Sequence, residues 1–550
     1  MTGRQSLGTR IKEYLGNPGC RPDVNHKAPI CTGRELLKAE GDDSKHEHDE
    51  EVRTVGAEST EGSTESDKNS FDNVEVGLSH GKIWTMLNYT GLKKASSDKI
   101  LDRLVDFAGS QVVFFLMWII LIVWIVIGII YKAPDNWQIV IQDGQSIQSY
   151  FWDTLLMRQQ LNSSHEHVWI CANIRSRLKT IRRLCTMEQP KEKASPNATV
   201  KVSSSSGQLP IESWYDRVCS KACDFIGSLP VMIIFWLGIF TWIGCGAVPT
   251  TTGNKPPFSK SNPQKAKFSD EWQLYVNTST AVIILICCVF LQNIRARHER
   301  FIAKFVLALS RMDVSIEKHL RTYFRDFETE NPNICIPTHH RNRLSKWIDW
   351  YADIIGTGIG VCIALGVIAV WIAIGDPMSW NGNWWLIIGT YTGLVGFLDG
   401  FVLRQVYFKI VHHEENNYEK VAEEDYDLFQ TLGIELREEC VVHSDSFASL
   451  NSITYRISSK INSICSSDWS VVASVVIILS LIIIASGLRW SETAQLICNT
   501  PTMIIEAFFL IVLLQAHGWA DKKRRMQVAA LHARRVALLT YVEESYPLSC

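Results

Sequence analysis

A long run of apolar residues near residue 110 constrains the fold of this chain more than any other feature. Residues 111–131 read QVVFFLMWIILIVWIVIGIIY and contain no charged side chain. A helix of about 20 apolar residues is long enough to cross the hydrocarbon core of a bilayer. A second strong run, VVASVVIILSLIIIASG, begins at Val471. The chain is therefore expected to be an integral membrane protein.

Eight segments of this kind follow the hydrophilic start of the chain. The second and the sixth are weaker by hydropathy, because each is polar on one side. Their ranges are 110–131, 137–157, 225–248, 272–292, 354–375, 384–404, 469–488 and 494–515. We predict an all-α membrane protein with about eight transmembrane helices.

The eight segments form four pairs that repeat one pattern. In three pairs the first segment ends with Trp and Gly four residues apart, in WIVIG, WIGCG and WIAIG, and in the fourth only Gly487 is assigned to this pattern. The second segments open with WQIVIQD, WQLYVNT, WWLIIGT and AQLICNT. We predict four copies of one helical hairpin. The alternative is convergence on the composition that membrane helices share.

The distribution of Lys and Arg predicts the topology. The stretches IRSRLKTIRR and RARHERFIAK follow the second and fourth segments, which places these connections in the cytoplasm. Both termini then lie inside, and the four hairpins are parallel repeats. The second helix of each pair is expected to continue into the cytosol. The expected units are a cytoplasmic tail at 1–100, hairpin repeats at 101–185, 213–330, 345–440 and 464–545, and a linker at 186–212.

The first 100 residues are hydrophilic and include GDDSKHEHDEE and STEGSTESDKNS. A segment with so little apolar surface does not offset the entropy of ordering it, so we expect a mostly disordered tail. No cleavable signal peptide is visible. The 15 cysteines are scattered, and none falls in the loops assigned to the outside, so reduced thiols are expected.

Polar residues recur along the second helix of each pair. Counted from its first residue, Glu506 stands at position twelve, Asp399 at fifteen and Asp153 at sixteen. At 100° and about 1.5 Å per residue, these positions share one face and form a ladder. If the four helices surround an axis, the ladder converges on it. The candidate metal ligands are Gln142, Asp143, Asp153, Asn277, Cys287, Cys288, Asp399, Asn499 and Glu506.

Three carboxylates do not share a low-dielectric site unless a cation neutralises them or some are protonated. Oxygen ligands beside a thiol suit a divalent ion such as Fe²⁺, Mn²⁺ or Zn²⁺. The alternative is polar contact between helices, with Asp153 pairing with Arg158 and Asp399 pairing with Arg404.

Other candidates have simpler explanations. HEHDEE at 46–51 is a solvated charge run, and Asp353 and Asp468 begin helices, where the helix dipole favours acids. The remaining candidates are His339, His340, HHEE at 412–415, and the pair Cys219 and Cys223, for which no second pair completes a zinc site. The chain contains no GxxxxGKS/T loop and no HExxH pattern, so an ATP-driven pump or a hydrolase is disfavoured. The basic stretches flank membrane segments, so nucleic acid is not expected as a partner.

Three stretches resemble a known family. YLGNPGCRPDVNHKAP, QDGQSIQSYFWDTLLMRQQ and WQLYVNTSTAVIILICCVFLQN are similar to the low-affinity iron(II) permease family of the fungal plasma membrane. The resemblance implies a permease that takes Fe²⁺ into the cell without a ferroxidase partner or a cofactor. It also implies tolerance for Zn²⁺, Cu²⁺ and Mn²⁺. The ligand set above comes from the ladder and not from the resemblance.

Two functions remain open at this point. The first is a permease in which the membrane potential drives divalent ions inward, and the second is a membrane-anchored sensor or scaffold that acts through its cytoplasmic helices. Flux in proteoliposomes separates the two. The oligomeric state is also open, a homo-oligomer included.

Overall fold

The computed structural model describes residues 23–31, 96–187, 214–248, 268, 270–338, 342–434 and 453–548. These residues are almost entirely helical. Six helices are long and apolar enough to cross a membrane, or seven if the bent pair α9–α10 counts as one span. The described part of the protein is therefore an all-α membrane protein with one small two-stranded sheet.

One unit of three helices occurs four times in the described residues. A short helix leads through a two-residue break into an apolar helix, which is followed along the chain by a long helix. The short helices are α3 (Ser96–Ala108), α6 (Trp214–Ile226), α9 (Arg343–Ile355) and α12 (Ile453–Cys465). The apolar helices are α4 (Gln111–Tyr131), α7 (Leu229–Gly246), α10 (Gly358–Ala373) and α13 (Asp468–Gly487). The long helices are α5 (Asp135–Met187), α8 (Asp270–Phe324), α11 (Gly382–Leu432) and α14 (Glu492–Ser545).

The break between short and apolar helix was not predicted from the sequence. The predicted segment 225–248 runs through it, because a hydropathy window does not register a change of direction. At the break a small hydroxyl residue caps the apolar helix: Ser110 accepts a hydrogen bond from the backbone N of Val113 (3.4 Å), and Ser467 accepts one from Ser470 (3.2 Å). The bend between α9 and α10 is 67°.

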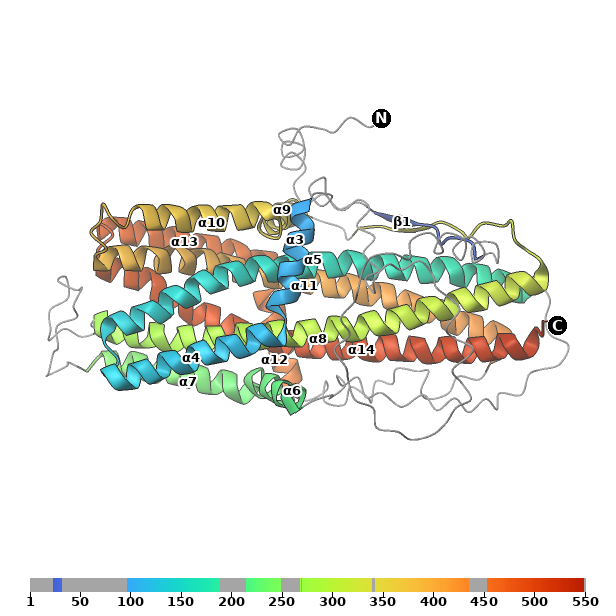
Figure 1. The fold of residues 1–550 in the computed structure, drawn as a ribbon, viewed down its shortest axis with the longest axis horizontal. Helices are drawn as coiled ribbons and strands as arrows, with labels where there is room; N and C mark the ends of the chain where they lie inside the picture. Colours follow the sequence, from blue (N-terminus) through green and yellow to red (C-terminus); the bar gives the residue numbers. More distant parts are fainter. Residues whose placement is uncertain are drawn as a thin grey trace, which may run out of the picture.

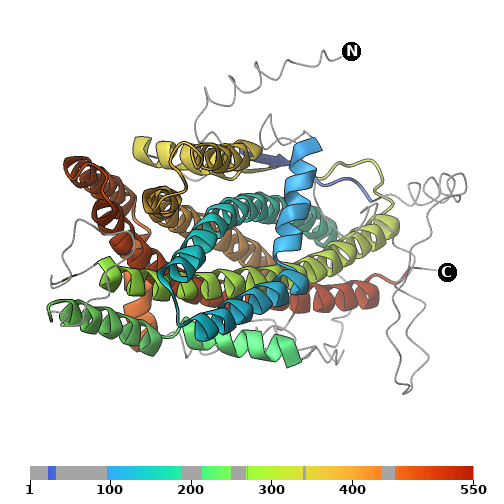
Figure 2. The same ribbon diagram turned by 60° about the vertical axis from the view of Figure 1, so that its left-hand side comes forward.

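The four long helices form a central bundle that runs the length of the molecule (Figure 1). α5 packs against α8 and α11, and α14 packs against the same two helices, so the order around the bundle is α5, α8, α14, α11. The short and apolar helices of each repeat lie against their own long helix and one neighbour. They surround only one half of the bundle, as Figure 2 shows.

The paired tryptophans join the two arms of three hairpins. The Trp124 and Trp137 rings stack with centroids 3.8 Å apart, and each indole N–H donates to the backbone oxygen of the other residue (3.1 and 2.7 Å). Trp242 with Trp272, and Trp371 with Trp384, repeat this arrangement. The pairing satisfies both polar N–H groups although the rings are half-buried or buried, which a lipid environment requires.

The glycine of this motif makes room for the ring. A Cβ on Gly128 would lie 2.2 Å from Cζ2 of Trp137. In the fourth hairpin the turn hydrogen bond runs from Trp490 N to Ala485 O (2.9 Å), as it runs from Ala133 N to Gly128 O (2.8 Å) in the first. The equivalent residue is therefore Ala485, and the assignment of Gly487 was wrong. A methyl group fits there because position 494 is alanine, not tryptophan.

Gly128→Ala is expected to destabilise the protein, whereas Gly487→Ala is not. The first methyl group overlaps the Trp137 ring, and overpacking of this kind costs about 1–3 kcal/mol. The second meets no atom within 4 Å. Thermal unfolding of the purified variants in detergent measures the difference. Equal midpoints for the two variants would contradict the role given to Gly128.

A short N-terminal segment is folded onto the end of the bundle that the apolar helices leave free (Figure 1). Strand β1 (Val24–His26) pairs antiparallel with β2 (Ile334–Ile336), and Ala28 N donates to Ser176 Oγ of α5 (3.1 Å). Residues 23–31 are thus an exception within the tail predicted at 1–100. Most of that tail, and the linker predicted at 186–212 from residue 188 on, lie outside the described residues.

Candidate metal pathway on the bundle axis

The long helices place equivalent residues of the four repeats at the same height. Positions are counted from Trp137, Trp272, Trp384 and Ala494. Arg295, Tyr407 and His517 share position 23: the Tyr407 and His517 rings are 3.8 Å apart, and Arg295 lies 3.5 Å from His517 Nδ1. Glu414 and Arg524 share position 30 and form a salt bridge. Equivalent positions of the long helices therefore form successive levels along the bundle axis.

The first level, at positions five and six, is rich in amides. A Cβ on Gly389 would lie 3.3 Å from Oδ1 of Asp143 and 3.7 Å from Nδ2 of Asn499. Asp143 and Asn499 therefore meet over a residue that has no side chain. Gln142 instead donates to Thr278 of the neighbouring helix (3.0 Å). The structure thus brings Asp143 and Asn499 together. Gln142 instead links α5 to α8 through its hydrogen bond to Thr278.

Several buried polar atoms at this end of the axis have no hydrogen-bond partner among the described residues. Asn277 is 0 % exposed, and neither its Oδ1 nor its Nδ2 is paired there. The same holds for Asp143 Oδ2, Gln145 Oε1, Thr390 Oγ1, Asn499 Oδ1 and Thr500 Oγ1. Native interiors rarely leave such groups unpaired, so these atoms are available to water or to a cation.

The carboxyl groups occupy the next level. Asp153, Asp399 and Glu506 are 6 %, 1 % and 7 % exposed, so none faces lipid. The charged groups that act on Asp153 are the carboxyls of Asp399 and Glu506. The Ser149 hydroxyl lies beside both Glu506 and the thiol of Cys288. Three carboxyl groups and one thiol from four different helices thus face the same part of the axis.

Asp399 is held by a residue that the sequence analysis did not consider. The hydroxyl of Tyr351, on α9, donates to Asp399 Oδ1 (2.6 Å). The expected alternative partner, Arg404, donates instead to Asn462 Oδ1 (2.7 Å) and to the backbone O of Phe509 (3.2 Å). Asp399 Oδ2 has no hydrogen-bond partner within the described part of the chain. The structure therefore does not show the ion pair that would make Asp399 purely structural.

The carboxyl groups do not form a closed coordination shell. Across the described ranges, no three His, Cys, Asp or Glu side chains lie close enough to hold one ion. Glu506 and Asp153 stand four positions apart in register, which is about 6 Å along the axis. Cys288 is near Asp153 and Glu506, whereas Cys287 interacts with Cys223 of α6. A spread of ligands suits weak, stepwise binding better than a permanent site.

Apolar side chains close the axis beyond the carboxyl groups. At position 19 each long helix carries a leucine, and these leucines are between 0 % and 2 % exposed: Leu156, Leu291, Leu403 and Leu513. We call them the leucine layer. The Phe401 and Phe509 rings stand edge to face beside it, with centroids 4.4 Å apart. A hydrated ion does not pass such a layer unless the helices move.

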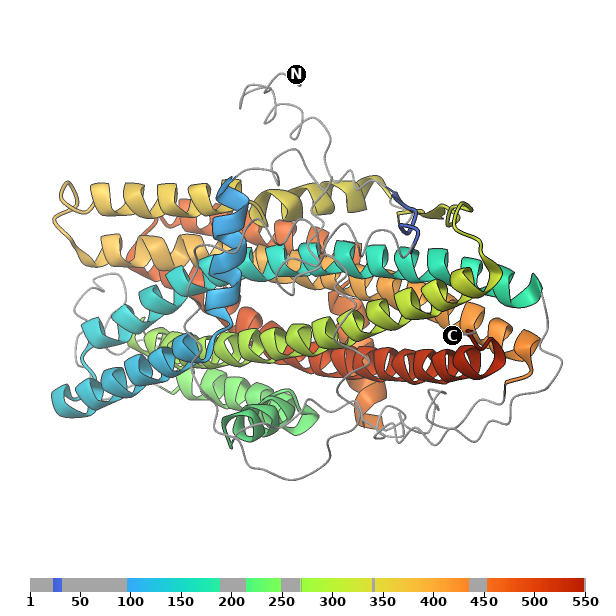
Figure 3. The same ribbon diagram turned by 45° about the vertical axis from the view of Figure 1, so that its right-hand side comes forward.

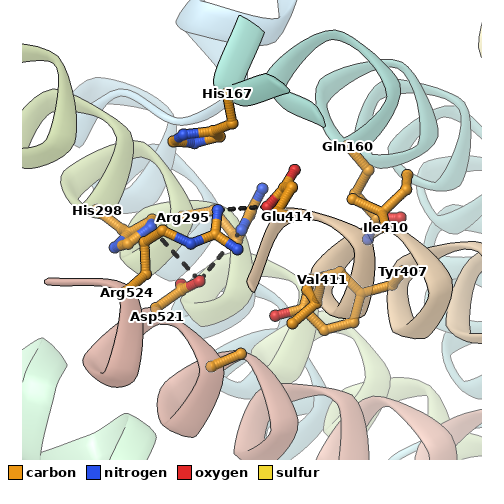
Figure 4. Close-up of a pocket in the computed structure, with 11 residues that line it drawn as sticks. Gln160, His167, Arg295, His298, Tyr407, Ile410, Val411, Glu414, Asp521 and Arg524 are labelled. Carbon is orange, nitrogen blue, oxygen red and sulfur yellow. Dashed lines mark hydrogen bonds and ion pairs between the residues drawn. The ribbon is translucent and has the colours of Figure 1, made fainter. Parts of the chain in front are cut away.

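A polar cavity lies directly beyond the leucine layer (Figure 4). All four long helices contribute to its lining: Gln160, His167, Arg295, His298, Tyr407, Ile410, Val411, Glu414, Ala520, Asp521 and Arg524. Glu414 pairs with Arg524, and Arg295 pairs with Asp521 (3.4 Å). Two guanidinium groups therefore lie in this cavity, on the far side of the leucine layer from the carboxyl groups.

The histidines of this cavity carry lowered pKa values. Burial, together with the charges of Arg525 and Arg295, holds the pKa of His298 well below its usual range. Burial and the charge of Arg524 do the same to the pKa of His167, whose Nδ1 lies 2.8 Å from the Tyr418 hydroxyl. Both imidazoles are therefore neutral in the folded protein near neutral pH.

Acidification from about pH 7 to about pH 5 is expected to cost stability through these histidines. The unfolded chain takes up protons near pH 6.5 and the folded chain does not, so the contribution is complete above pH 6.5 and is lost below it. The slope is about 1.4 kcal/mol per pH unit for each histidine. The measurement compares the thermal unfolding midpoints of the native protein and of the double variant His167→Gln/His298→Gln across this pH range.

The comparison with the variant is needed because burial raises the pKa of Glu414 and Asp521, which changes stability in the opposite direction. The double variant should lose stability less steeply on acidification. Identical slopes for variant and native protein would contradict the assignment of neutral, buried histidines.

The weaker candidates from the sequence lie elsewhere. Asp468 is bound to Lys409 (2.7 Å) and accepts a hydrogen bond from Ser345 (2.9 Å). Cys219 and Cys223 are buried on α6. His339, His340 and the run at 46–51 lie outside the described residues.

Comparisons with known proteins agree with the resemblance in the sequence. The family described as low affinity iron permease matches residues 97–195, 343–408 and 454–540. The "Low-affinity Fe(2+) transport protein" of Saccharomyces cerevisiae is 54 % identical over 553 residues, covering 98 % of each chain. The "Low-affinity iron/zinc ion transport protein fet4" of Schizosaccharomyces pombe is 40 % identical over 540 residues, covering 97 % of this chain and 85 % of the relative. No solved structure matches the chain.

Proposed function

Because the chain belongs to the low-affinity iron permease family, we propose that it takes iron(II) into the cytosol along the axis of its four long helices. It is a transporter, not an enzyme. The observation that supports the proposed path is that Asp153, Asp399 and Glu506, from three of these helices, are all buried and that Asp153 lies within electrostatic reach of the other two. Buried acids inside a membrane protein line ion pathways as a rule.

The proposed membrane arrangement has eight crossings. These are the four apolar helices and the first halves of the long helices, residues 137–157, 272–292, 384–404 and 494–515. A helix of 53 residues such as α5 is about 80 Å long, whereas the hydrocarbon core is about 30 Å thick, so its second half lies in the cytosol. α5 is included although its composition is polar, because its polar side chains face the other long helices. Both termini lie inside, and the membrane is the plasma membrane.

The proposed path begins among the unpaired amides. The ion exchanges part of its hydration shell for oxygens of Asp143, Asn277 and Asn499, which the structure leaves without hydrogen bonds among the described residues. The ion then reaches the level of Asp153, Asp399 and Glu506. Two ionised carboxylates at this level neutralise the charge of a divalent cation. The membrane potential contributes about 2 × 2.3 kcal/mol per 100 mV to the entry of a divalent cation, so no nucleotide hydrolysis is required.

Mixed ligands predict broad selectivity and weak binding. Carboxylate, amide and thiol groups at different heights fit several first-row ions, and selectivity among these ions then follows geometry and supply. We therefore extend the proposal to Zn²⁺, Cu²⁺ and Mn²⁺. The S. pombe relative is named for both iron and zinc, which supports the extension to zinc.

The conformation described here is closed on the cytosolic side. The leucine layer and the ion pairs Arg295–Asp521 and Glu414–Arg524 lie between the carboxyl level and the cytosol. Release of the ion requires both to separate. Four helices of one chain enclose the whole path, so a homo-oligomer is not needed to complete it.

Uptake of radiolabelled iron(II) tests the proposal in cells that lack other iron importers, and in proteoliposomes with an imposed potential, negative inside. We expect saturable uptake that grows with the potential, and competition by zinc and manganese. A chain that restores cellular iron supply but gives no flux in proteoliposomes would instead act as the sensor or scaffold. Deletion of 409–460 would then abolish its effect, while changes at the carboxyl groups would not.

A further inference from the structure

The four short helices lie where the two halves of the molecule meet. α3 and α12 run across the long axis of the bundle, at the boundary between the half covered by the apolar helices and the half without them (Figures 1 and 3). Each short helix ends at the two-residue break that leads into its apolar helix. In the proposed orientation, this boundary coincides with the cytosolic surface of the membrane.

One charge pattern recurs in all four short helices. Counting back from the break residues Gly109, Gly227, Gly356 and Ser466, the tenth residue is always basic: Lys99, Arg217, Lys346 and Arg456. The sixth residue is basic in three of the four: Arg103, Lys221 and Lys460. Six of these seven side chains are exposed, and that of Lys99 lies outside the described residues. Residues four apart share a helix face, so the two basic residues of α6, and likewise the two of α12, lie on one face of their helix.

Exposed apolar side chains stand next to the basic ones. The ninth residue before each break is Ile100, Val218, Trp347 or Ile457, exposed by 65 %, 51 %, 61 % and 44 %. The second residue before the break is also apolar and exposed in three helices: Phe107, Phe225 and Ile464. A helix with adjacent basic and apolar exposed residues fits the plane of a membrane surface, with the apolar groups among the acyl chains.

The opposite faces of α6, α9 and α12 are fixed to the bundle. Asp216 of α6 pairs with Arg297 (3.0 Å), and Asn462 of α12 accepts a hydrogen bond from Arg404 (2.7 Å). Tyr351 of α9 donates to Asp399. These contacts determine which side of each helix faces outward. The hydrogen bond of Tyr351 also connects α9 to Asp399 of the proposed path.

We propose that α3, α6, α9 and α12 form a collar that binds the head groups of anionic phospholipids in the cytosolic leaflet. This inference uses the proposed orientation but does not depend on which ion is carried. Each Lys/Arg pair faces the phosphate of a lipid whose chains contact the neighbouring apolar residue. Anionic lipids attract basic residues at the membrane surface, and the pairs of α6 and α12, together with Arg103 and Lys346, make the attraction additive. Since Tyr351 holds Asp399, the bound lipid also steadies one side of the path.

The test compares lipid bound to the full-length protein and to two variants. The collar variant carries Arg217→Gln, Lys221→Gln, Arg456→Gln and Lys460→Gln. The control carries the same charge change at exposed positions of the long helices, Lys179→Gln, Lys304→Gln, Arg311→Gln and Lys420→Gln. Each protein is reconstituted in phosphatidylcholine with a minority of phosphatidylserine, extracted gently, and the retained lipids are quantified.

We expect phosphatidylserine to be enriched several-fold over its bulk fraction around the native protein and the control. The collar variant should lose at least half of this enrichment while its thermal unfolding midpoint is unchanged. Equal enrichment in the collar variant and the native protein, or equal loss in the control, would overturn the proposal. Soluble glycerophosphoserine, added at the same concentration as the phosphatidylserine, should not displace the bound lipid. Displacement would overturn the proposal, because it would show a site for the free head group and not a membrane-binding surface. Lipid retention is measured without any ion transport. The outcome of this test therefore does not depend on whether the proposed iron transport is confirmed.

Discussion

Replacing Asp153 by Asn and Glu506 by Gln together is expected to reduce iron(II) uptake more than tenfold. The changes preserve side-chain size but remove two negative charges from the level where the ion is neutralised. A loss of only about 1.4 kcal/mol of binding free energy per carboxylate lowers affinity tenfold, and two such losses multiply if they are independent. The measurement is the initial rate of radiolabelled uptake, normalised to the amount of protein at the cell surface.

The matched control is Asp376→Asn, which removes an exposed carboxylate from the turn between α10 and α11. It should leave uptake unchanged. Each single variant should fall between the control and the double variant. Wild-type uptake by the double variant at equal surface expression would remove these residues from the path.

Replacing Arg535 by Met is expected to lower the free energy of unfolding by about 3–5 kcal/mol. Arg535 pairs with Asp313 and with Asp425, each at 2.6 Å, and all three side chains are at most 2 % exposed. Removal of one member of a buried ionic cluster leaves the partner charges without compensation, and this costs far more than a surface pair. Arg534 also pairs with Asp425 and therefore still compensates part of that charge in the variant. Asp313 loses its ion pair with Arg535.

Arg182→Met is the matched comparison. Arg182 pairs with Asp427 at 2.9 Å, but the two side chains are 44 % and 60 % exposed, so solvent screens the pair and the expected loss is below about 1 kcal/mol. Thermal unfolding and limited proteolysis of both variants measure the difference. Similar shifts in the two variants would show that the buried cluster does not stabilise the cytosolic half of the bundle.

The class of fold could be predicted from the sequence because the apolar runs are long and the hairpin motif recurs. The Trp and Gly spacing in WIVIG and WIGCG corresponds to the stacked pairs Trp124–Trp137 and Trp242–Trp272. The continuation of the second helices was also predicted, and α5 ends at Met187. These features follow from local composition and periodicity, which one chain displays directly.

Features that depend on the direction of the chain in space, or on which residue a side chain contacts, were not predicted. The break at Gly227 and Ser228 changes the course of the chain without changing its hydropathy. Gly487 was matched to the glycine motif by residue type, whereas the turn hydrogen bond identifies Ala485. A glycine is required only where a ring approaches, and the sequence does not show which ring does so.

The candidate site could be predicted only in part for a related reason. Intramembrane carboxylates such as Asp153 and Glu506 stand out because lipid excludes them. Buried leucines such as Leu403 do not stand out, because leucine is equally common on the lipid-facing side. Tyr351 comes from a short helix of the same repeat as Asp399, and that helix was not expected to reach the path.

A structure with manganese or iron bound, with the ion located by its anomalous scattering, tests the central claim most directly. The account predicts a peak on the axis of the four long helices, with Asp153, Asp399 and Glu506 as its nearest carboxyl groups. A peak bound away from this axis, with these three carboxyl groups unoccupied at saturating metal, would contradict it.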